Sequence, residues 1–368
     1  MEEGVRRGEI HSYESFYIVN SIHAIVNTKE ALKEIAKRVD VSYITLNQEI
    51  APIETVQEST RRRRSIESSS LYAIDWPVNM IHADRVWEEY GIYGEGVVVG
   101  IIDTGVNYKL PSLKKSFKGY DAASDRFIPG YYKDFFEDKE EPEDSYVNNH
   151  GTHIAGIICG DFLESKIGIA PKVKFISARA VGPDGTSVVK IIRSSEWMLE
   201  KRPDVINCSW GYHNDNNIWF SQIAQAWRDA GIVAVFAAGN TQNIQTLAAP
   251  GSITNPGNLP NVIAVGAVDS EKRLAKFSKR GPSAFDRGEN YPKPDFVAPG
   301  VSIRSSTAMG SLIRKSGTSY AAPYVTATVA LMRSANPNIT VSEIEEILKS
   351  TTEPLLQLQL HLVNFLDW

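Results

Sequence analysis

The apolar residues of this chain follow two periodicities that alternate along most of its length. Runs dense in β-branched and other apolar residues read GVVVGIID, VKFISARAV, DVINCSW, IVAVFAAGN and NVIAVGAV. Such continuous runs predict strands that are buried on both faces. Between them, VVKIIRSSEWMLEKR and FSQIAQAWRDAG carry apolar residues at helical spacing. Strands that alternate with helices predict an α/β fold with a parallel, doubly wound sheet.

The start of the chain follows a different pattern. FYIVNSIHAIVN alternates like two short strands, TKEALKEIAKRV has a helical pattern with Thr28 as its N-cap, and VSYITL predicts a closing strand. Residues 55–70 contain few apolar residues, a serine cluster and a run of arginines, which predicts an exposed linker. We therefore expect a small α+β unit at residues 1–54, then the linker, then a large domain at residues 71–368.

Composition and charge remove several function classes. With 42 % hydrophobic and 23 % charged residues, the 368-residue chain has the balance of an ordinary globular protein. A net charge of -5 gives no bias toward nucleic acid or anionic membranes. No apolar run approaches the roughly 18 residues of a spanning helix, and the polar N-terminus lacks the apolar core of a secretory signal. Cys159 and Cys208 lie among apolar residues and are expected to be buried thiols.

Three short motifs carry the candidate chemistry. IIDTGV places Asp103 at the end of the first buried strand, and NNHGTHIAGII places His150 before a Gly-Thr turn, with His153 opening an apolar helix. KSGTSYAAPYVTATVALM places Ser319 at the N-terminus of a helix of small residues, where free amides favour a developing oxyanion. Alone, the acid and the serine are also explained as turn or helix caps. Together, in the order Asp, His, Ser, the motifs indicate a catalytic triad.

The two histidines of the second motif raise the alternative of a metal pair. His150 and His153 are three positions apart, and no acidic residue near them has ligand-like spacing. The HExxH pattern of zinc peptidases is also absent from the motif. We therefore expect no metal at these histidines.

The motifs resemble those of the subtilase family of serine peptidases. The resemblance runs from about Tyr72 to Pro354 and includes, in family order, YAIDWPVNMIHADRVW, NCSWG, FAAGN, PGSITNPGNLP, AVGAVD, FSKRGPS, PDFVAPGVSIRSS and LMRSANP. It implies a subtilisin-like three-layer fold and a serine endopeptidase that forms an acyl-enzyme. By this resemblance Asp103 orients His150, His150 acts as general base and then general acid, and Ser319 is the nucleophile.

The resemblance also implies an oxyanion hole and a substrate groove. Asn240 resembles the side-chain donor of the oxyanion hole, beside the Ser319 amide. One wall of the groove resembles an edge strand that pairs with an extended substrate, and small residues on the opposite wall imply broad cleavage after large apolar or aromatic residues. The residues of these two walls are Ser209, Trp210, Gly211, Ala237, Ala238 and Gly239.

The unit at residues 16–54 resembles the second half of the family's inhibitory propeptide. It implies self-processing in the linker, near or after Arg64, and a last segment that blocks the groove until the cut. The implied partners are polypeptide substrates and the propeptide itself, with no nucleic acid and no membrane. A monomer and an extracellular location are implied as well. The alternative is a catalytically weak relative that binds polypeptides through the same groove.

The chain departs from the family pattern at several positions. No cofactor is expected to be required, and calcium is weakly supported because Ser112 stands where many relatives carry a ligating Asp. The acidic segment DFFEDKEEPED, residues 134–144, is the remaining candidate for calcium. Tyr320 follows Ser319 where many relatives carry Met, which implies activity that survives mild peroxide. The C-terminal run LLQLQLHLVNFLDW is expected to leave apolar residues poorly buried.

Overall fold

The computed structural model describes most of the chain. The described residues are 1–50, 73–144, 149–162, 165–182, 184–212, 219–242, 246–283, 285, 291–355 and 360–362. The expected linker at residues 55–70 lies outside them.

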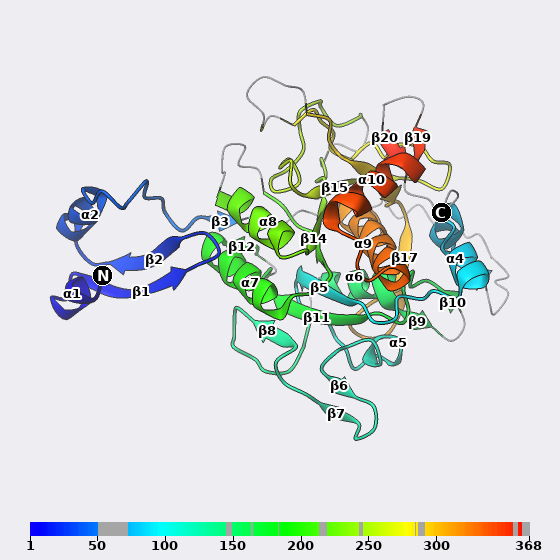
Figure 1. Cartoon of the computed structure of the whole chain (residues 1–368), viewed down its shortest axis with the longest axis horizontal. Helices are drawn as coiled ribbons and strands as arrows, with labels where there is room; N and C mark the ends of the chain where they lie inside the picture. Colours follow the sequence, from blue (N-terminus) through cyan, green and yellow to red (C-terminus); the bar gives the residue numbers. More distant parts are fainter. Residues whose placement is uncertain are drawn as a thin grey trace.

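Helices and strands alternate through the large domain, as Figure 1 shows. The helices are α1 Glu2–Arg6, α2 Lys29–Ala36, α3 Trp76–Met80, α4 Ala83–Tyr90, α5 Pro111–Lys114, α6 His150–Cys159, α7 Val188–Lys201, α8 Trp219–Asp229, α9 Thr318–Ala335 and α10 Val341–Thr351. The strands of the main sheet are β5 Val98–Asp103, β8 Tyr132–Asp134, β11 Lys174–Arg179, β13 Val205–Cys208, β14 Val233–Ala237, β15 Ile263–Val268, β16 Phe296–Pro299, β19 Glu353–Leu355 and β20 Leu360–Leu362. The other strands are β1 Ile10–Phe16, β2 Ser21–Val26, β3 Glu49–Ile50, β4 Ala73–Ile74, β6 Tyr120–Asp121, β7 Arg126–Phe127, β9 Asp161–Phe162, β10 Ser165–Lys166, β12 Thr186–Ser187, β17 Ile303–Ser306 and β18 Leu312–Lys315.

The main sheet has nine strands in the order β19-β20-β16-β15-β14-β13-β5-β11-β8. Every pair from β20 to β8 is parallel, and β19 pairs antiparallel with β20 at the edge. The predicted central, mainly parallel sheet is therefore confirmed. Leu355, the first residue of the C-terminal run, ends β19, and Leu360–Leu362 form β20. The expected poor burial of the run's other apolar residues concerns side chains that lie outside the described part of the structure.

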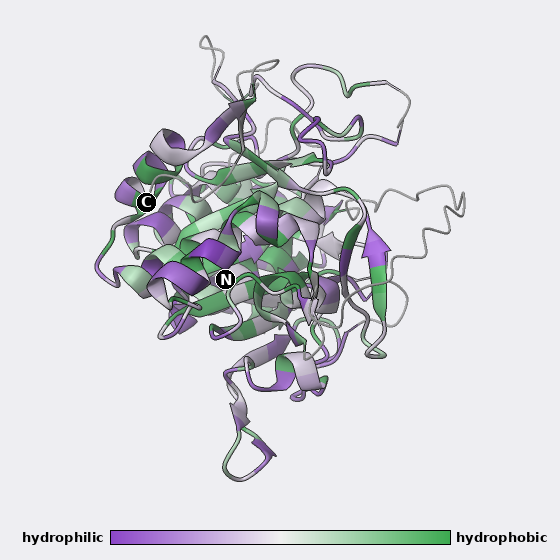
Figure 2. Ribbon diagram, turned by 90° about the vertical axis from the view of Figure 1, so that its right-hand side faces the viewer, coloured by the Kyte–Doolittle hydropathy of each residue, from purple (hydrophilic) through white to green (hydrophobic). Residues whose placement is uncertain are grey.

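The helices cover both faces of the sheet and complete three layers. Because alternate side chains of a strand point to opposite faces, neighbouring residues of β5 enter different parts of the core. Ile101 packs with residues of α6 and α9, whereas Ile102 packs with residues of α7 and α8. Figure 2 shows the hydrophobic residues concentrated in the middle of the molecule. The predicted helices at VVKIIRSSEWMLEKR and FSQIAQAWRDAG correspond to α7 and α8.

The N-terminal unit contains α1, the antiparallel β1–β2 hairpin and α2. The predicted cap is present, since Thr28 Oγ1 accepts a hydrogen bond from the Ala31 backbone N–H at 3.2 Å. The predicted closing strand VSYITL is wrong, because residues 41–46 pair with no other described strand and Leu46 is 84 % exposed. The segment that does pair comes later, where β3 lies antiparallel to β12 of the large domain.

A buried ion pair supports the loop that precedes β16. Lys293 Nζ contacts Asp295 Oδ2 at 2.6 Å and donates to the Val262 carbonyl at 2.7 Å. The two side chains are 0 % and 10 % exposed, and burial lowers the pKa of Lys293. The Ala264 backbone N–H also donates to Asp295 Oδ2, at 2.7 Å. Removal of the carboxylate would leave a buried ammonium without its counter-ion.

We expect Asp295→Ala to lower the free energy of unfolding by about 3–5 kcal/mol, as for other broken buried pairs. The matched control is the exposed pair Lys272–Glu353, whose side chains are 41 % and 43 % exposed. Glu353→Ala should lower the free energy of unfolding by about 1 kcal/mol or less. Urea unfolding in a Ser319→Ala background measures both without proteolysis of the chain. Equal losses in the two variants would show that burial of the Lys293 pair is unimportant.

Candidate active site

The last residue of β5 and the first residue of α6 meet at the carboxyl edge of the sheet. Asp103 Oδ1 lies 2.7 Å from His150 Nδ1, and the two residues are 1 % and 8 % exposed. The Thr104 backbone N–H also donates to Asp103 Oδ1, at 2.8 Å. Because a carboxylate accepts hydrogen bonds, it holds the imidazole proton on Nδ1 and leaves Nε2 as the basic nitrogen. Helix α6 begins at His150, one turn earlier than the expected start at His153.

Ser319 is the second residue of α9 and is 1 % exposed. Its hydroxyl donates to the Ser209 carbonyl at 3.0 Å, while Ser209 Oγ donates to the Ser319 carbonyl at 2.7 Å. Among the described residues, His150 Nε2 has no hydrogen-bond partner. The structure thus joins Asp103 to His150 but not Ser319 to His150. In enzymes without substrate such a bond is often long or unformed, and it tightens in the complex.

Asn240 follows β14 and is held at the N-terminus of α9. Its Oδ1 accepts hydrogen bonds from the backbone N–H and from the hydroxyl of Thr318, each at 2.9 Å. This fixes the amide so that Nδ2 lies beside Gly317, where an added Cβ would stand only 3.1 Å away. The glycine therefore leaves the amide nitrogen of Asn240 next to the free end of α9. Thr318, which the sequence analysis did not single out, orients this side chain.

The segment Ser209–Gly211 continues directly from β13. The Trp210 ring is 4 % exposed and its Nε1 donates to the Ile102 carbonyl at 3.0 Å. The indole therefore belongs to the core, and this segment can present only backbone atoms to a ligand. The expected pairing with a substrate strand is compatible with that arrangement.

The opposite wall, Ala237–Gly239, is also backbone and methyl groups, with Ala237 and Ala238 fully buried. The sequence analysis missed the residue that packs against it. Thr254 Oγ1 donates to the Ala238 carbonyl at 3.0 Å. A Cβ added to Gly239 would lie 2.6 Å from Thr254 Oγ1. The next residue, Asn255, exchanges backbone hydrogen bonds with Tyr212 beyond the first wall. Thr254 and Asn255 thus join the two walls through hydrogen bonds.

Strand β12 is a second element that the sequence analysis missed. It spans only Thr186–Ser187, which is too short for a periodic pattern. It pairs antiparallel with Glu49–Ile50 of the N-terminal unit. Ile50 is 6 % exposed and packs in the same core cluster as residues of α7 and α8.

Tyr320 separates the two histidines of the second motif. Its ring centroid lies 5.5 Å from that of His150 and 4.7 Å from that of His153. Burial raises the pKa of Tyr320 and lowers that of His153 well below its usual range. His153 is therefore a neutral packing residue. Within the described ranges, no group of three or more His, Cys, Asp or Glu side chains has the arrangement of a metal site.

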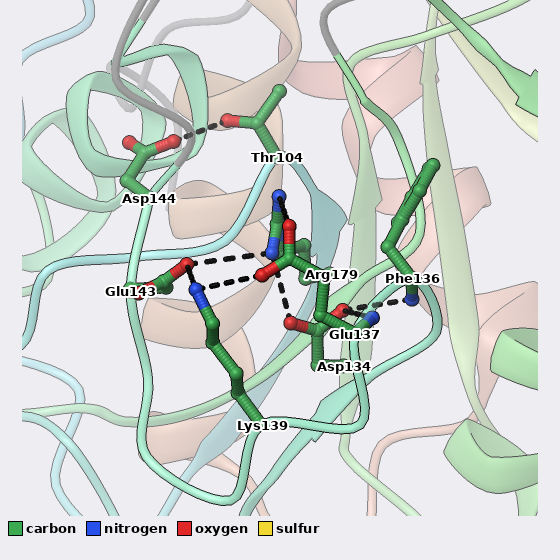
Figure 3. A network of polar contacts seen from close by, with 8 residues as sticks. All are labelled: Thr104, Asp134, Phe136, Glu137, Lys139, Glu143, Asp144 and Arg179. Carbon is green, nitrogen blue, oxygen red and sulfur yellow. Dashed lines mark hydrogen bonds and ion pairs between the residues drawn. The ribbon is translucent and has the colours of Figure 1, made fainter.

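The acidic segment, residues 134–144, folds around a buried arginine (Figure 3). Arg179 from β11 is 7 % exposed and contacts Asp134 at 2.9 Å, Glu143 at 3.5 Å and Glu137 at 3.6 Å. Lys139 pairs with the same two glutamates. Three of the carboxylates that were considered for calcium, those of Asp134, Glu137 and Glu143, thus have cationic side chains as partners.

Comparison with known proteins gives concordant matches. Residues 94–365 match the profile described as the Subtilase family. The chain is 35 % identical over 364 residues to Bacillopeptidase F of Bacillus subtilis (strain 168), a match that covers 94 % of this chain and 24 % of that protein. It is 31 % identical over 284 residues to Subtilisin DY of Bacillus licheniformis, covering 77 % and 92 %. The chain therefore spans about a quarter of the first relative and most of the second.

A solved structure of a cold-adapted subtilisin-like serine proteinase superimposes with a TM-score of 0.57 at 25 % identity. The superposition covers 74 % of this chain and 90 % of that protein. The expected subtilisin-like fold is confirmed. In the part of the chain that the structure describes, no helix has the length and apolar content needed to cross a membrane.

The packing of Tyr320 against His150 predicts how hydrolytic activity responds to oxidation. Tyr320→Met would place a thioether beside the imidazole, so we expect dilute hydrogen peroxide to abolish most activity of this variant while the unchanged protein retains most of its own. Tyr320→Leu is the control, because leucine resembles methionine in size but has no sulfur. Casein hydrolysis measures all three, and equal inactivation would show that the residue next to Ser319 does not set peroxide sensitivity.

Proposed function

The chain belongs to the subtilase family of serine endopeptidases, and on that basis we propose that Asp103, His150 and Ser319 are its catalytic triad. The observation that carries the proposal is the 2.7 Å contact between Asp103 and the Nδ1 atom of His150, at the sheet edge where α9 also begins. A buried acid in this contact leaves His150 Nε2 free to accept a proton. The nucleophile stands at a helix N-terminus, which favours negative charge.

In the proposed reaction, rotation of the Ser319 side chain turns its hydroxyl from the Ser209 carbonyl to His150 Nε2. His150 takes the hydroxyl proton as the oxygen attacks the substrate carbonyl, and the imidazolium that forms is stabilised by Asp103. The tetrahedral intermediate collapses to an acyl-enzyme, and the leaving amine takes the proton from His150. Water then repeats the sequence, its proton going to His150 and returning to Ser319, to release the acid and restore the hydroxyl.

The developing oxyanion would be bound by the Asn240 side-chain amide and the Ser319 backbone N–H. Two features support this role for Asn240. Its Oδ1 is already committed to Thr318, so the amide group cannot rotate freely. Its Nδ2 lies beside Gly317, at the open start of α9. Donors fixed before the reaction stabilise the transition state without reorganisation.

We infer that polypeptides bind as an extended strand between Ser209–Gly211 and β12. The first segment offers backbone groups next to the nucleophile, and β12 already pairs antiparallel with a segment of this chain. The small residues of the wall Ala237–Gly239 support a preference for large apolar or aromatic residues before the cut. In such strand pairing the enzyme forms hydrogen bonds mainly with the backbone of the substrate and contacts few of its side chains, which supports broad specificity.

The N-terminal unit is proposed to be an inhibitory propeptide that the enzyme removes itself. It covers the start of α7, where the first backbone N–H groups have no partner within the helix. The Val188 N–H donates to the Gln48 carbonyl at 3.0 Å, and the Val189 N–H donates to Asn47 Oδ1 at 3.2 Å. The next residues of the unit, Glu49 and Ile50, pair with β12 in the position proposed for substrate. An occupied groove of this kind excludes other polypeptides until the chain is cut.

On the α7 side, Glu196 Oε1 accepts hydrogen bonds from the backbone N–H groups of Tyr17, at 2.8 Å, and Ile18, at 3.2 Å. Arg193 of the same helix pairs with Glu14. These contacts support a propeptide that binds as a preformed unit. We further propose a monomeric, extracellular enzyme that needs no cofactor, in keeping with the family resemblance.

The proposed function is tested with purified chain and Ser319→Ala side by side. We expect casein hydrolysis, and a new N-terminus between Ile50 and Leu71, in the unchanged chain alone. Mass spectrometry of the casein peptides should show large apolar or aromatic residues before most cuts. If both proteins stay full length and inactive while folded, the catalytically weak polypeptide-binding relative is the better description.

The propeptide contact is tested by Glu196→Gln in the Ser319→Ala background, where the chain stays intact. Hydrogen bonds to a charged acceptor contribute about 1.5–3 kcal/mol, so loss of the charge should speed amide exchange at Tyr17 and Ile18 about tenfold or more. Glu88→Gln is the control, since Glu88 is exposed on α4. Hydrogen–deuterium exchange measures both variants, and unchanged exchange in Glu196→Gln would show that this carboxylate does not hold the unit.

A further inference from the structure

Asp144 closes the acidic segment, and its carboxylate is buried between two elements of the site. Its Oδ1 accepts a hydrogen bond from Thr104 Oγ1 at 2.6 Å, and its Oδ2 accepts one from the Thr152 backbone N–H at 2.9 Å. Thr104 comes directly after the triad acid, and Thr152 comes two residues after the triad histidine. One carboxylate therefore bridges the two segments that carry the acid and the base.

Thr104 extends this bridge to the reacting groups. Its hydroxyl, while donating to Asp144, accepts a hydrogen bond from the Gly151 backbone N–H at 3.0 Å. Its own backbone N–H donates to Asp103 Oδ1 at 2.8 Å. Thr104 thus connects Asp144 to both the Asp103 carboxylate and the first turn of α6 through its hydroxyl and its backbone N–H.

The three segments also pack backbone against backbone. An added Cβ on Gly105 would lie 1.8 Å from the Glu143 carbonyl oxygen, and one on Gly151 would lie 2.0 Å from the Gly105 carbonyl oxygen. Gly105 and Asp144 form an isolated antiparallel bridge. No side chain separates the acidic segment from the turn after β5 at these contacts, so a shift of one moves the other.

Ion pairs with Arg179 also hold the segment, as Figure 3 shows. Arg179 contacts Asp134 at its start and Glu143 next to Asp144. Arg179 therefore holds the residue next to Asp144 in the chain.

The ionisation of Asp144 suits this bridging role. Both of its partners donate to it, so the carboxylate form fits the site, and protonation removes the charge and weakens both bonds. Burial raises the pKa of Asp144 to about 6, although Thr104 and Thr152 act against that shift. Asp103 of β5 and Lys315 of β18 interact electrostatically with Asp144. His150 of α6 is the partner of Asp103, and Arg179 of β11 pairs with Glu143, the neighbour of Asp144.

We propose that Asp144 is a positioning residue of the triad, whose carboxylate sets the geometry between Asp103 and His150 through Thr104 and the first turn of α6. It touches neither substrate nor reacting atoms. The inference rests on the proposed function of the triad. It adds that proton transfer by His150 depends on a second buried acid.

The first test compares Asp144→Asn with Glu140→Gln, which removes the same charge from an exposed position of the same segment. We expect kcat of Asp144→Asn to fall about 10²-fold with little change in KM, since small misplacements of reacting groups have effects of that size. Glu140→Gln should keep the kcat of the unchanged chain. Rates are referred to sites titrated with a fluorophosphonate, so that misfolded protein does not count.

The pH profile separates positioning from a general structural role. Protonation of the Asp144 carboxylate, whose pKa burial raises to about 6, weakens its hydrogen bonds to Thr104 and Thr152. We therefore expect log kcat/KM to fall more steeply on the acidic side in the unchanged chain than in Asp144→Asn, which has no carboxylate to protonate there. An unchanged kcat, or a lower kcat with the profile of the unchanged chain, would overturn the proposal.

A second pair of variants tests the proposal even if Asp144→Asn does not fold. Thr104→Val removes the hydroxyl that links Asp144 to α6 and should lower kcat in the same direction, whereas Thr104→Ser should restore it. Full activity of Thr104→Val would contradict the bridge.

A measurement without turnover keeps this inference distinct from the proposed function. In Ser319→Ala, the proton NMR signal of His150 Nδ1–H reports the contact with Asp103, and Asp144→Asn should shift or broaden it. If the unchanged chain shows no Ser319-dependent hydrolysis, the proposed function fails while this signal still decides the role of Asp144. An unaltered signal would refute the bridge.

Discussion

The parallel direction of the central strands is the constraint on which the rest of the site depends. Because β5, β13 and β14 run the same way in register, the residues after them lie along one edge of the sheet. Asp103, Ser209 and Asn240 therefore gather there although they are far apart in the sequence. Helices α6 and α9 begin at the same edge, so their free amides and positive dipole ends face the acid and amide side chains. Reversal of one central strand would remove its contribution from the site entirely.

This constraint explains why much of the molecule could be predicted from the sequence. Asp103 and Asn240 end or follow continuous apolar runs, and a parallel sheet follows from the alternation of those runs with helices. Other parts have no local pattern to read. Strand β12 is two residues long and pairs only because β3 lies beside it. The sequence VSYITL has the composition of a strand but pairs with no other strand among the described residues, so composition alone misleads there. Thr254 and Asp144 gain their positions from contacts between segments that no periodicity links.

Around Asp103, His150 and Ser319, polar groups that would be unfavourable in an apolar core are held by other segments of the chain. Thr318 orients Asn240, Thr104 links Asp103 to the start of α6, and Arg179 holds the acidic segment. Each contact joins elements distant in sequence, so the hydrogen bonds lock the relative placement of the elements as well as satisfying the buried groups.

The pairing of β3 with β12 has a consequence for how dilution acts on this protein. While the chain is continuous, Glu49–Ile50 meets β12 at an effective concentration that tethering alone sets and that does not depend on the volume of the solution. After a cut, the same segment becomes a separate molecule that dissociates according to its own affinity and its concentration in the surrounding solution. Hydrolysis of a single bond would thus change how Glu49–Ile50 binds to β12. Before the cut its binding does not depend on the volume of the solution, and after the cut the segment is lost on dilution. At a lower concentration of the cut protein, a larger fraction of the β12 strands would therefore be free of Glu49–Ile50.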